Sequence, residues 1–263
     1  MPTTDPGAAR RAPAPGPGVP AVVPVERDDP AAPGGSAALR VLRGLPLVRR
    51  SVAALLAARR VGRVVVPTAP GLALAVEEAL DGLAPAVHVL AVTRSGPGGQ
   101  VLAALDAVLA SDGPVPDVVV VHDPLHPLAP PDLVDAVVAA LDEPAPDGEA
   151  WGAAVPVRPV TDTLTWVDPD EVVTGHADRS AFRMVYSPQA HRTGPLHEAL
   201  RRAPRAALRA GGAHVLPELV QGGGGGRLRS VPAPGEVFRV ATEQDLVIAD
   251  AVLHVGGDPL ART

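Results

Sequence analysis

Residues 63–92, RVVVPTAPGLALAVEEALDGLAPAVHVLAV, carry the pattern that decides the fold. The run 63–66 is typical of a buried strand, an apolar pattern with helical spacing follows at 71–80, and a second strand-like run occupies 86–92. A strand, a helix and a strand at this spacing indicate a right-handed crossover between parallel strands. This stretch therefore predicts a βαβ unit.

The same alternation extends in both directions along the chain. The further strands are expected at 21–25 and 117–121, and the further helices at 45–60, 100–110 and 131–141. The last of these helices begins with proline, which the first turn of a helix tolerates. We therefore expect an α/β fold, a three-layer Rossmann-like domain with a mostly parallel central sheet.

The rhythm changes after Asp147. Short strands joined by tight turns are expected at 153–160, 163–167 and 171–174, and we interpret residues 154–174 as an extended β-arm. Further along, we expect a helix at 195–210, strands at 227–231 and 237–240, and a closing helix at 242–253. Thr242 is a good N-cap for that helix, although Asp245 stands where a full capping box has Glu or Gln.

The composition favours one globular domain of this class. Of the 263 residues, 46% are hydrophobic but only 2% are aromatic, so Ala, Val and Leu must fill the core. Small apolar residues suit helices packed closely on a valine-rich sheet. We expect a disordered leader at 1–19, one domain at 20–255 and a tail at 256–263.

Charge and cysteine content exclude several function classes. The chain has 29 acidic and 23 basic residues, every basic one being Arg, so no broad nucleic-acid footprint is visible. Without cysteine there are no disulfides, thiolate metal sites or Cys nucleophile, which fits a reducing compartment. The N-terminus has no apolar h-region and no stretch reaches membrane-spanning length. We expect a cytoplasmic protein with no nucleic-acid or membrane partner.

The segment after the strand at 117–121 contains the most informative polar residues. In a parallel α/β sheet, ligands bind beyond the carboxyl ends of the strands, where Asp123 lies. Its carboxylate suits a magnesium ion that bridges nucleotide phosphates, and capping of the following turn is an equally good interpretation. His122 and His126 are four residues apart, but the prolines at 124 and 127 disfavour a helical zinc site.

Two glycine-rich segments are candidates for binding phosphate. The run Gly222–Gly226 lacks the Lys-Ser/Thr of a phosphate-binding loop and leads into a strand, so we interpret it as a flexible loop. Ser95-Gly-Pro-Gly-Gly99 precedes a helix, which leaves two interpretations open, a modest anion-binding role or a loop with a helix cap. No Gly-x-Ser-x-Gly supports a hydrolase.

Four motifs, in order, resemble those of the 2-C-methyl-D-erythritol 4-phosphate cytidylyltransferase family, a group of nucleotidyltransferases. The motifs are His122-Asp-Pro-Leu-His-Pro127; Ala154-Val-Pro-Val157 with Val160-Thr-Asp-Thr163; Asp178-Arg179 followed by Ser187-Pro-Gln189; and Phe238-Arg-Val-Ala-Thr-Glu-Gln-Asp-Leu246. The family has His-Asp-Ala-x-Arg-Pro, Pro-Val-x-Asp-Thr, Asp-Arg with Thr-Pro-Gln, and a segment of the type Asn-Ile-Lys-Val-Thr-x-Pro-Glu-Asp-Leu. The resemblance runs from about Val22 to the closing helix.

The resemblance implies an enzyme that joins a cytidine nucleotide from CTP to a sugar-alcohol phosphate, with Mg²⁺, in isoprenoid precursor biosynthesis. It also implies a homodimer whose arms complete each other's sites. The roles it assigns are catalytic for Arg239 and Asp123, metal binding for Asp123, nucleotide binding for Pro24, Val25, Arg27 and Asp123, and substrate binding for His126, Thr163, Arg179 and Ser187. Thr163 and Arg179 would act from the partner subunit.

The segment after the first strand departs from the family pattern. Where the family has two glycines, an Arg and a Lys, this chain has Arg27, Asp29, Ala31 and Ala38. The lost cations and the added carboxylates predict weak CTP binding, with Arg27 or Arg40 as the available replacements. The alternative hypothesis is a catalytically silent paralogue that keeps the fold and the dimer arm for binding or regulation.

Overall fold

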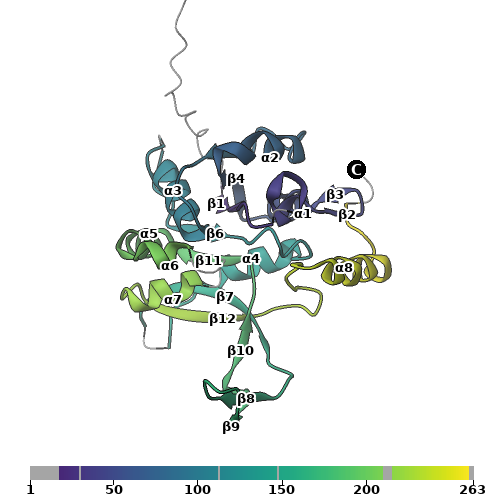
Figure 1. Ribbon diagram of the computed structural model, residues 1–263. Helices are drawn as coiled ribbons and strands as arrows, with labels where there is room; N and C mark the ends of the chain where they lie inside the picture. The colour runs from purple at the N-terminus through teal and green to yellow at the C-terminus, as the bar shows by residue number, and fades with distance from the viewer. Residues whose placement is uncertain (1–17, 30, 112, 147, 210–214, 261–263) are drawn as a thin grey trace, which may run out of the picture.

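Figure 1 shows the computed structural model, which describes residues 18–29, 31–111, 113–146, 148–209 and 215–260. The expected leader at 1–19 lies outside the described residues except for its last two, as do the final three residues of the tail.

One mixed sheet forms the centre of the molecule. Its strands are β1 (Val19–Val22), β4 (Val61–Thr68), β5 (Val87–Ala91), β6 (Val118–Val121), β7 (Trp151–Pro159), β10 (Arg183–Val185), β11 (Gln189–Arg192) and β12 (Arg227–Pro232). They are arranged in the order β10-β7-β11-β6-β1-β4-β5, with β12 also paired to β7. Only β10 and β11 run antiparallel to their neighbours. The expected α/β fold with a mostly parallel sheet is confirmed.

Helices cover both faces of this sheet (Figure 1). The helices are α1 (Leu47–Ala57), α2 (Ala73–Ala79), α3 (Pro97–Leu109), α4 (Pro131–Ala139), α5 (Thr193–Arg202), α6 (Arg205–Arg209), α7 (Val215–Gly222) and α8 (Glu243–Gly256). Alternate strand residues supply two separate apolar cores. Val64 and Val66 pack on the side of α1, α2 and α4, whereas Val65 packs on the side of α3, α5 and α7. None of the described helices is both long and apolar enough to cross a membrane.

The arm begins later in the chain than the sequence suggested. The first six residues of β7 are buried in the central sheet, so they belong to the body of the domain. Strands β8 (Leu164–Val167) and β9 (Val173–Ala177) form a separate antiparallel hairpin that projects from the body (Figure 1). The projecting part spans about residues 160–182, followed by β10, which pairs with the end of β7.

Several local expectations differ from the structure for identifiable reasons. The helix expected at 195–210 is divided into α5 and α6, because Pro204 disfavours helical backbone at Ala203. The segment 237–240 is not a strand, although Val237 and Val240 are buried. Asp245 does complete a capping box, since its carboxylate accepts the Thr242 N–H at 2.8 Å while the Thr242 hydroxyl accepts the Asp245 N–H. Helix α7 and strands β10 and β11 were not expected.

A buried ion pair connects the segment that follows α8 to α1. The Arg50 guanidinium donates to both carboxylate oxygens of Asp258, at 2.9 and 2.8 Å, and also to the Leu42 carbonyl. The two side chains are 2% and 4% exposed. The hydrogen bond from Arg50 is the main cause that lowers the pKa of Asp258, and burial opposes it in part. The interaction therefore stabilises the fold only while Asp258 is ionised.

We expect Asp258→Asn to lower the free energy of unfolding at pH 7 by about 3 kcal/mol, because it leaves Arg50 buried without its partner charge. The folded-state pKa of Asp258 is depressed, so this stabilisation is present above the unfolded pKa of about 3.9 and is lost as pH falls below it. Urea unfolding should show a smaller difference in free energy of unfolding between the wild type and Asp258→Asn at pH 3 than at pH 7.

Asp250→Asn is the matched control, since Asp250 pairs with Arg43 at 2.7 Å but is 55% exposed. We expect this change to alter stability much less than Asp258→Asn does, because solvent screens an exposed ion pair. Equal losses in the two variants would contradict the interpretation of Arg50–Asp258 as a buried structural pair.

Candidate active site

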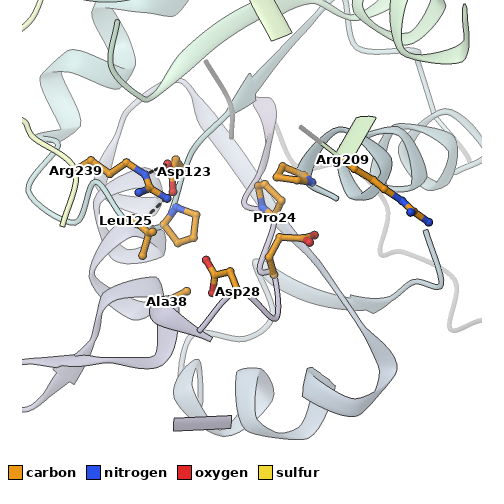
Figure 2. Close-up of a pocket in the computed structure, with 10 residues that line it drawn as sticks. Pro24, Asp28, Ala38, Asp123, Leu125, Arg209 and Arg239 are labelled. Carbon is orange, nitrogen blue, oxygen red and sulfur yellow. Dashed lines mark hydrogen bonds and ion pairs between the residues drawn. The ribbon is translucent and has the colours of Figure 1, made fainter. Parts of the chain in front are cut away.

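A cavity of about 290 Å³ lies at the carboxyl ends of β1 and β6 (Figure 2). The parallel pairing of Val22 with Val121 brings the segments that follow these two strands to the same edge of the sheet. The residues that line the cavity are Pro24, Glu26, Asp28, Ala38, Pro97, Asp123, Pro124, Leu125, Arg209 and Arg239. This is the position at which open α/β sheets bind ligands.

Asp123 is the central carboxylate of the cavity. One of its oxygens accepts the Leu125 N–H at 2.9 Å, so the residue does cap its own turn. The other oxygen lies 3.2 Å from Arg239 Nε and 3.6 Å from His126 Nδ1. Burial by itself would raise the pKa of Asp123, but His126, Arg239 and the Leu125 N–H together hold it well below its usual range. The side chain is therefore a carboxylate at neutral pH.

A buried serine holds the backbone that carries Asp123. The Ser187 hydroxyl accepts the Asp123 N–H at 2.8 Å and lies 2.9 Å from His122 Nδ1. Burial lowers the pKa of His122 to about 3, so the ring is neutral, and its Nδ1 shares a hydrogen bond with the Ser187 hydroxyl whose direction is set by the ring tautomer. Ser187 is 1% exposed and outside the cavity lining, so its geometry supports a positioning role rather than the expected contact with substrate. Sequence reasoning missed this use of His122.

His126 is also withdrawn from the cavity. It is 6% exposed, does not line the cavity, and meets the Tyr186 ring edge-on with the centroids 6.1 Å apart. Its contact with Asp123 supports an electrostatic effect on that carboxylate. Within the described ranges, no group of three His, Cys, Asp or Glu side chains is arranged to hold a metal ion.

In the segment after β1, two aspartate side chains accept hydrogen bonds from the backbone of the same segment. Asp28 accepts the Ala37 N–H at 2.9 Å, and Asp29 accepts the Ala31 N–H at 3.0 Å. Asp29 also binds the guanidinium of Arg40, which donates in addition to the Ala241 carbonyl at 3.0 Å. Backbone N–H groups and cations of this segment are thus engaged within the protein.

Of the three residues of this segment expected to bind the nucleotide, only Pro24 lines the cavity. Val25 is fully buried, and its carbonyl accepts hydrogen bonds from Thr68 and Gln100, each at 3.0 Å. Arg27 is exposed and donates to the Gly71 carbonyl at 3.3 Å. Neither Arg27 nor Arg40 lines the cavity, so the structure places neither of the arginines considered as replacements at the site.

Two other arginines reach the cavity from distant parts of the chain. Arg239 precedes α8, and its side chain is 49% exposed beside Asp123. Arg209 is the last residue of α6 and was not expected at the site. In Figure 2 the side chain of Arg209 points away from Asp123, whereas Arg239 points toward it. Arg239 is therefore the cation best placed to meet a ligand bound next to Asp123.

Glu26 adds a second buried carboxylate oxygen at the cavity. Burial raises the pKa of Glu26, the Gly96 N–H lowers it in part, and Asp28 raises it further. Its Oε1 is buried and has no hydrogen-bond partner among the residues that the structure describes. An unpartnered carboxylate oxygen of a residue that lines the same cavity as Asp123 is a hard ligand atom of the kind that Mg²⁺ prefers.

Thr163 and Arg179 lie on the projecting arm and not at the cavity. Thr163 is exposed, and Arg179 is exposed with its guanidinium bound to the Thr161 carbonyl. Within one chain the fold does not bring them to Asp123. Their contribution to the site of a partner subunit stays a prediction.

We expect Ser187→Ala to lower stability by about 1 to 2 kcal/mol, because the buried Asp123 N–H and His122 Nδ1 both lose a partner. Chemical unfolding measures this loss. Ser187→Thr keeps the hydroxyl and is the conservative control, which should restore most of the lost stability. An alanine variant as stable as the wild type would contradict the positioning role.

The sequence of the chain was compared with those of known protein families and proteins. The model of the IspD family, 2-C-methyl-D-erythritol 4-phosphate cytidylyltransferase, matches residues 30–255. A protein of that name from Frankia casuarinae is 36% identical over 248 residues, covering 94% of this chain and 85% of its own length. Another from Streptomyces avermitilis is 34% identical and covers 84% of this chain and 85% of its own.

Solved structures agree with the sequence matches. The crystal structure of 2-C-methyl-D-erythritol 4-phosphate cytidylyltransferase from Thermus thermophilus superposes with a TM-score of 0.65 at 29% identity, covering 89% of this chain and 98% of that one. The 4-diphosphocytidyl-2C-methyl-D-erythritol synthase of Anaerococcus prevotii has a TM-score of 0.71, and at 15% identity it supports the fold alone. The chain therefore belongs to the 2-C-methyl-D-erythritol 4-phosphate cytidylyltransferase family.

Proposed function

We propose that this protein transfers a cytidylyl group from CTP to 2-C-methyl-D-erythritol 4-phosphate. A phosphate oxygen of the sugar alcohol would attack the α-phosphorus of CTP, and the bond from that phosphorus to the diphosphate would break to release pyrophosphate. The observation that carries the proposal is the pair formed by Asp123 and Arg239 at the carboxyl end of β6. The family relationship supplies the substrates.

In this proposal Arg239 supplies the positive charge for the reacting phosphates. Charge accumulates on phosphoryl oxygens in the transition state, and a fixed guanidinium stabilises it without reorganisation. Asp123 limits the freedom of Arg239 through the contact at 3.2 Å, so the cation is oriented before substrate binds. Arg stands where the resemblance places a Lys, so the charge is kept with a broader, planar donor set.

The carboxylates of the cavity fit a divalent cation. Asp123 and Glu26 would hold Mg²⁺, the first because it is ionised and the second because its buried Oε1 has no partner in the described part of the chain. When bound, the ion would offset the negative charge of the nucleotide phosphates. Without a cation, Glu26, Asp28 and Asp123 would repel a triphosphate.

In this proposal, the segment after β1 contributes little to CTP binding, because it lacks the two cations of the family pattern and two of its N–H groups are already hydrogen-bonded. Ala31 and Ala38 replace cations, and the N–H groups of Ala31 and Ala37 already donate to Asp29 and Asp28. Each lost charge-assisted phosphate contact costs about 1.5 to 3 kcal/mol, so two lower the affinity about a hundredfold or more. Turnover would then need high CTP concentrations.

We expect release of pyrophosphate from millimolar CTP, 2-C-methyl-D-erythritol 4-phosphate and Mg²⁺ by concentrated protein. Arg239→Gln should lower kcat/KM by about a hundredfold or more, since it removes the cation beside the reacting phosphates. Phosphate release after added pyrophosphatase measures the rate. Arg202→Gln is the control and should change little, because Arg202 is an exposed residue of α5 paired with Glu198.

Absence of turnover at every CTP concentration would contradict the enzyme proposal and leave the catalytically silent paralogue. Equal rates for Arg239→Gln and wild type would instead contradict the role given to Arg239.

We also propose that the protein is a homodimer joined through the arm, in which Thr163 and Arg179 reach the partner's cavity. The arm and the adjacent strand β10 expose large apolar side chains, namely Trp166, Val167, Val172, Val173, Phe182, Met184 and Val185, at 39 to 59% exposure. Its hairpin β8–β9 pairs with no other strand among the described residues. A projecting apolar hairpin is typical of an interface.

The cytoplasmic location stays a prediction from the lack of cysteine.

We expect the wild type to have a dimer mass at micromolar concentration, and Trp166→Glu to have a monomer mass, by light scattering after gel filtration. A charge in a buried apolar interface is strongly unfavourable. Val247→Glu is the control, because Val247 is an apolar residue on α8 with 71% exposure. A monomeric wild type, or equal dissociation by both changes, would contradict the arm interface.

A further inference from the structure

A second cavity, of about 480 Å³, shares Arg209 with the candidate active site. The residues that line it are Thr93, Arg94, Ser95, Gly99, Arg205, Leu208 and Arg209. Three of these residues, Arg94, Arg205 and Arg209, carry a guanidinium group, and none carries a carboxylate. This is notable in a chain whose formal charge is -6, and the proposed reaction assigns no role to this cavity.

Close packing of α6 on the start of α3 creates this cluster. A Cβ at Gly96 would lie 2.4 Å from the Leu208 carbonyl oxygen, and one at Gly98 would lie 3.1 Å from Leu208 Cα. Only glycine lets the two backbones approach this closely. Arg205 and Arg209 are four residues apart on α6, so they share a face that is brought to the segment holding Arg94.

The positive charge of the cavity is largely uncompensated. Arg94 lies 3.3 Å from one oxygen of Asp106, whose other oxygen contacts His197 at 2.8 Å. Arg209 donates to the neutral Ser95 hydroxyl at 3.1 Å. Across the ranges that the structure describes, neither Arg205 nor Arg209 forms an ion pair with a carboxylate. Guanidinium groups held together in this way repel one another unless an anion lies between them.

We propose that the cavity formed around Arg94, Arg205 and Arg209 binds a diphosphate or triphosphate group. Several separate guanidinium groups match an anion with several phosphate oxygens, each pair able to form charge-assisted hydrogen bonds. The source is free pyrophosphate or the polyphosphate tail of a nucleotide. Arg209 places the site next to the cavity where the proposed reaction would release pyrophosphate, but binding itself does not depend on that reaction.

Calorimetric titration of the full chain with pyrophosphate, without CTP, tests this site. We expect Arg205→Gln to weaken binding about tenfold or more, because a charge-assisted contact is lost. This variant should fold normally, since Arg205 is exposed and lines the cavity without an ion pair in the described part of the chain. Arg202→Gln, which changes a nearby exposed arginine on α5, should bind pyrophosphate like the wild type.

The proposal is overturned if the wild type does not bind pyrophosphate, if Arg205→Gln binds it unchanged, or if Arg239→Gln alone abolishes binding. Titration in the presence of saturating CTP then separates the two sources. Competition identifies the nucleotide tail, and independent binding identifies free pyrophosphate; both support an anion site. A protein that binds pyrophosphate here but has no turnover contradicts the proposed function alone.

Discussion

The parallel register between β1 and β6 determines where the chemistry of this protein can lie. Val22 pairs with Val121, and the His122 N–H continues the ladder by donating to the Val22 carbonyl at 2.9 Å. Pro24 and Asp123 therefore leave the sheet side by side at the same edge. All four residues of β6 are buried valines, divided between the two apolar cores, so a slip of one residue would cost little at its faces but would move Asp123 away from the end of β1.

The site at that edge also depends on residues from distant parts of the chain, which hold Asp123 in position and keep it ionised. Asp123 keeps its negative charge in a buried position because His126 and Arg239, the latter 116 residues away in sequence, lie beside it and lower its pKa. The Ser187 hydroxyl holds the backbone of Asp123 from the segment just before β11, a strand that runs antiparallel to β6. The neutral His122 completes this arrangement through its hydrogen bond with the Ser187 hydroxyl. Ionisation and position of one carboxylate thus depend on three separate segments.

Positive charge is distributed differently from what the family motifs imply. Carboxylates of the segment after β1 bind its own N–H groups and the Arg40 guanidinium, so this segment is compact without a ligand. Uncompensated arginines gather instead around the second cavity, where α6 packs on α3. The consequence is a cavity lined by three carboxylates and Arg239 next to one lined by Arg94 and Arg205, with Arg209 shared between the two. The two neighbouring cavities therefore differ in charge, and only the first would need a bound cation to accept a polyanion.

The sequence by itself determined the α/β class, because the spacing of valine runs and helical apolar patterns is a local property of the chain. It also located Asp123 and Arg239, since strand ends and family motifs can be found by position. Only the tertiary structure decided that Val25 and Ser187 are buried, that Arg27 and Arg40 are bound elsewhere, and that Arg209 reaches both cavities. The physical reason is that burial, ion pairing and the close approach of Gly96 to Leu208 depend on contacts between residues far apart in the chain, which no local pattern records.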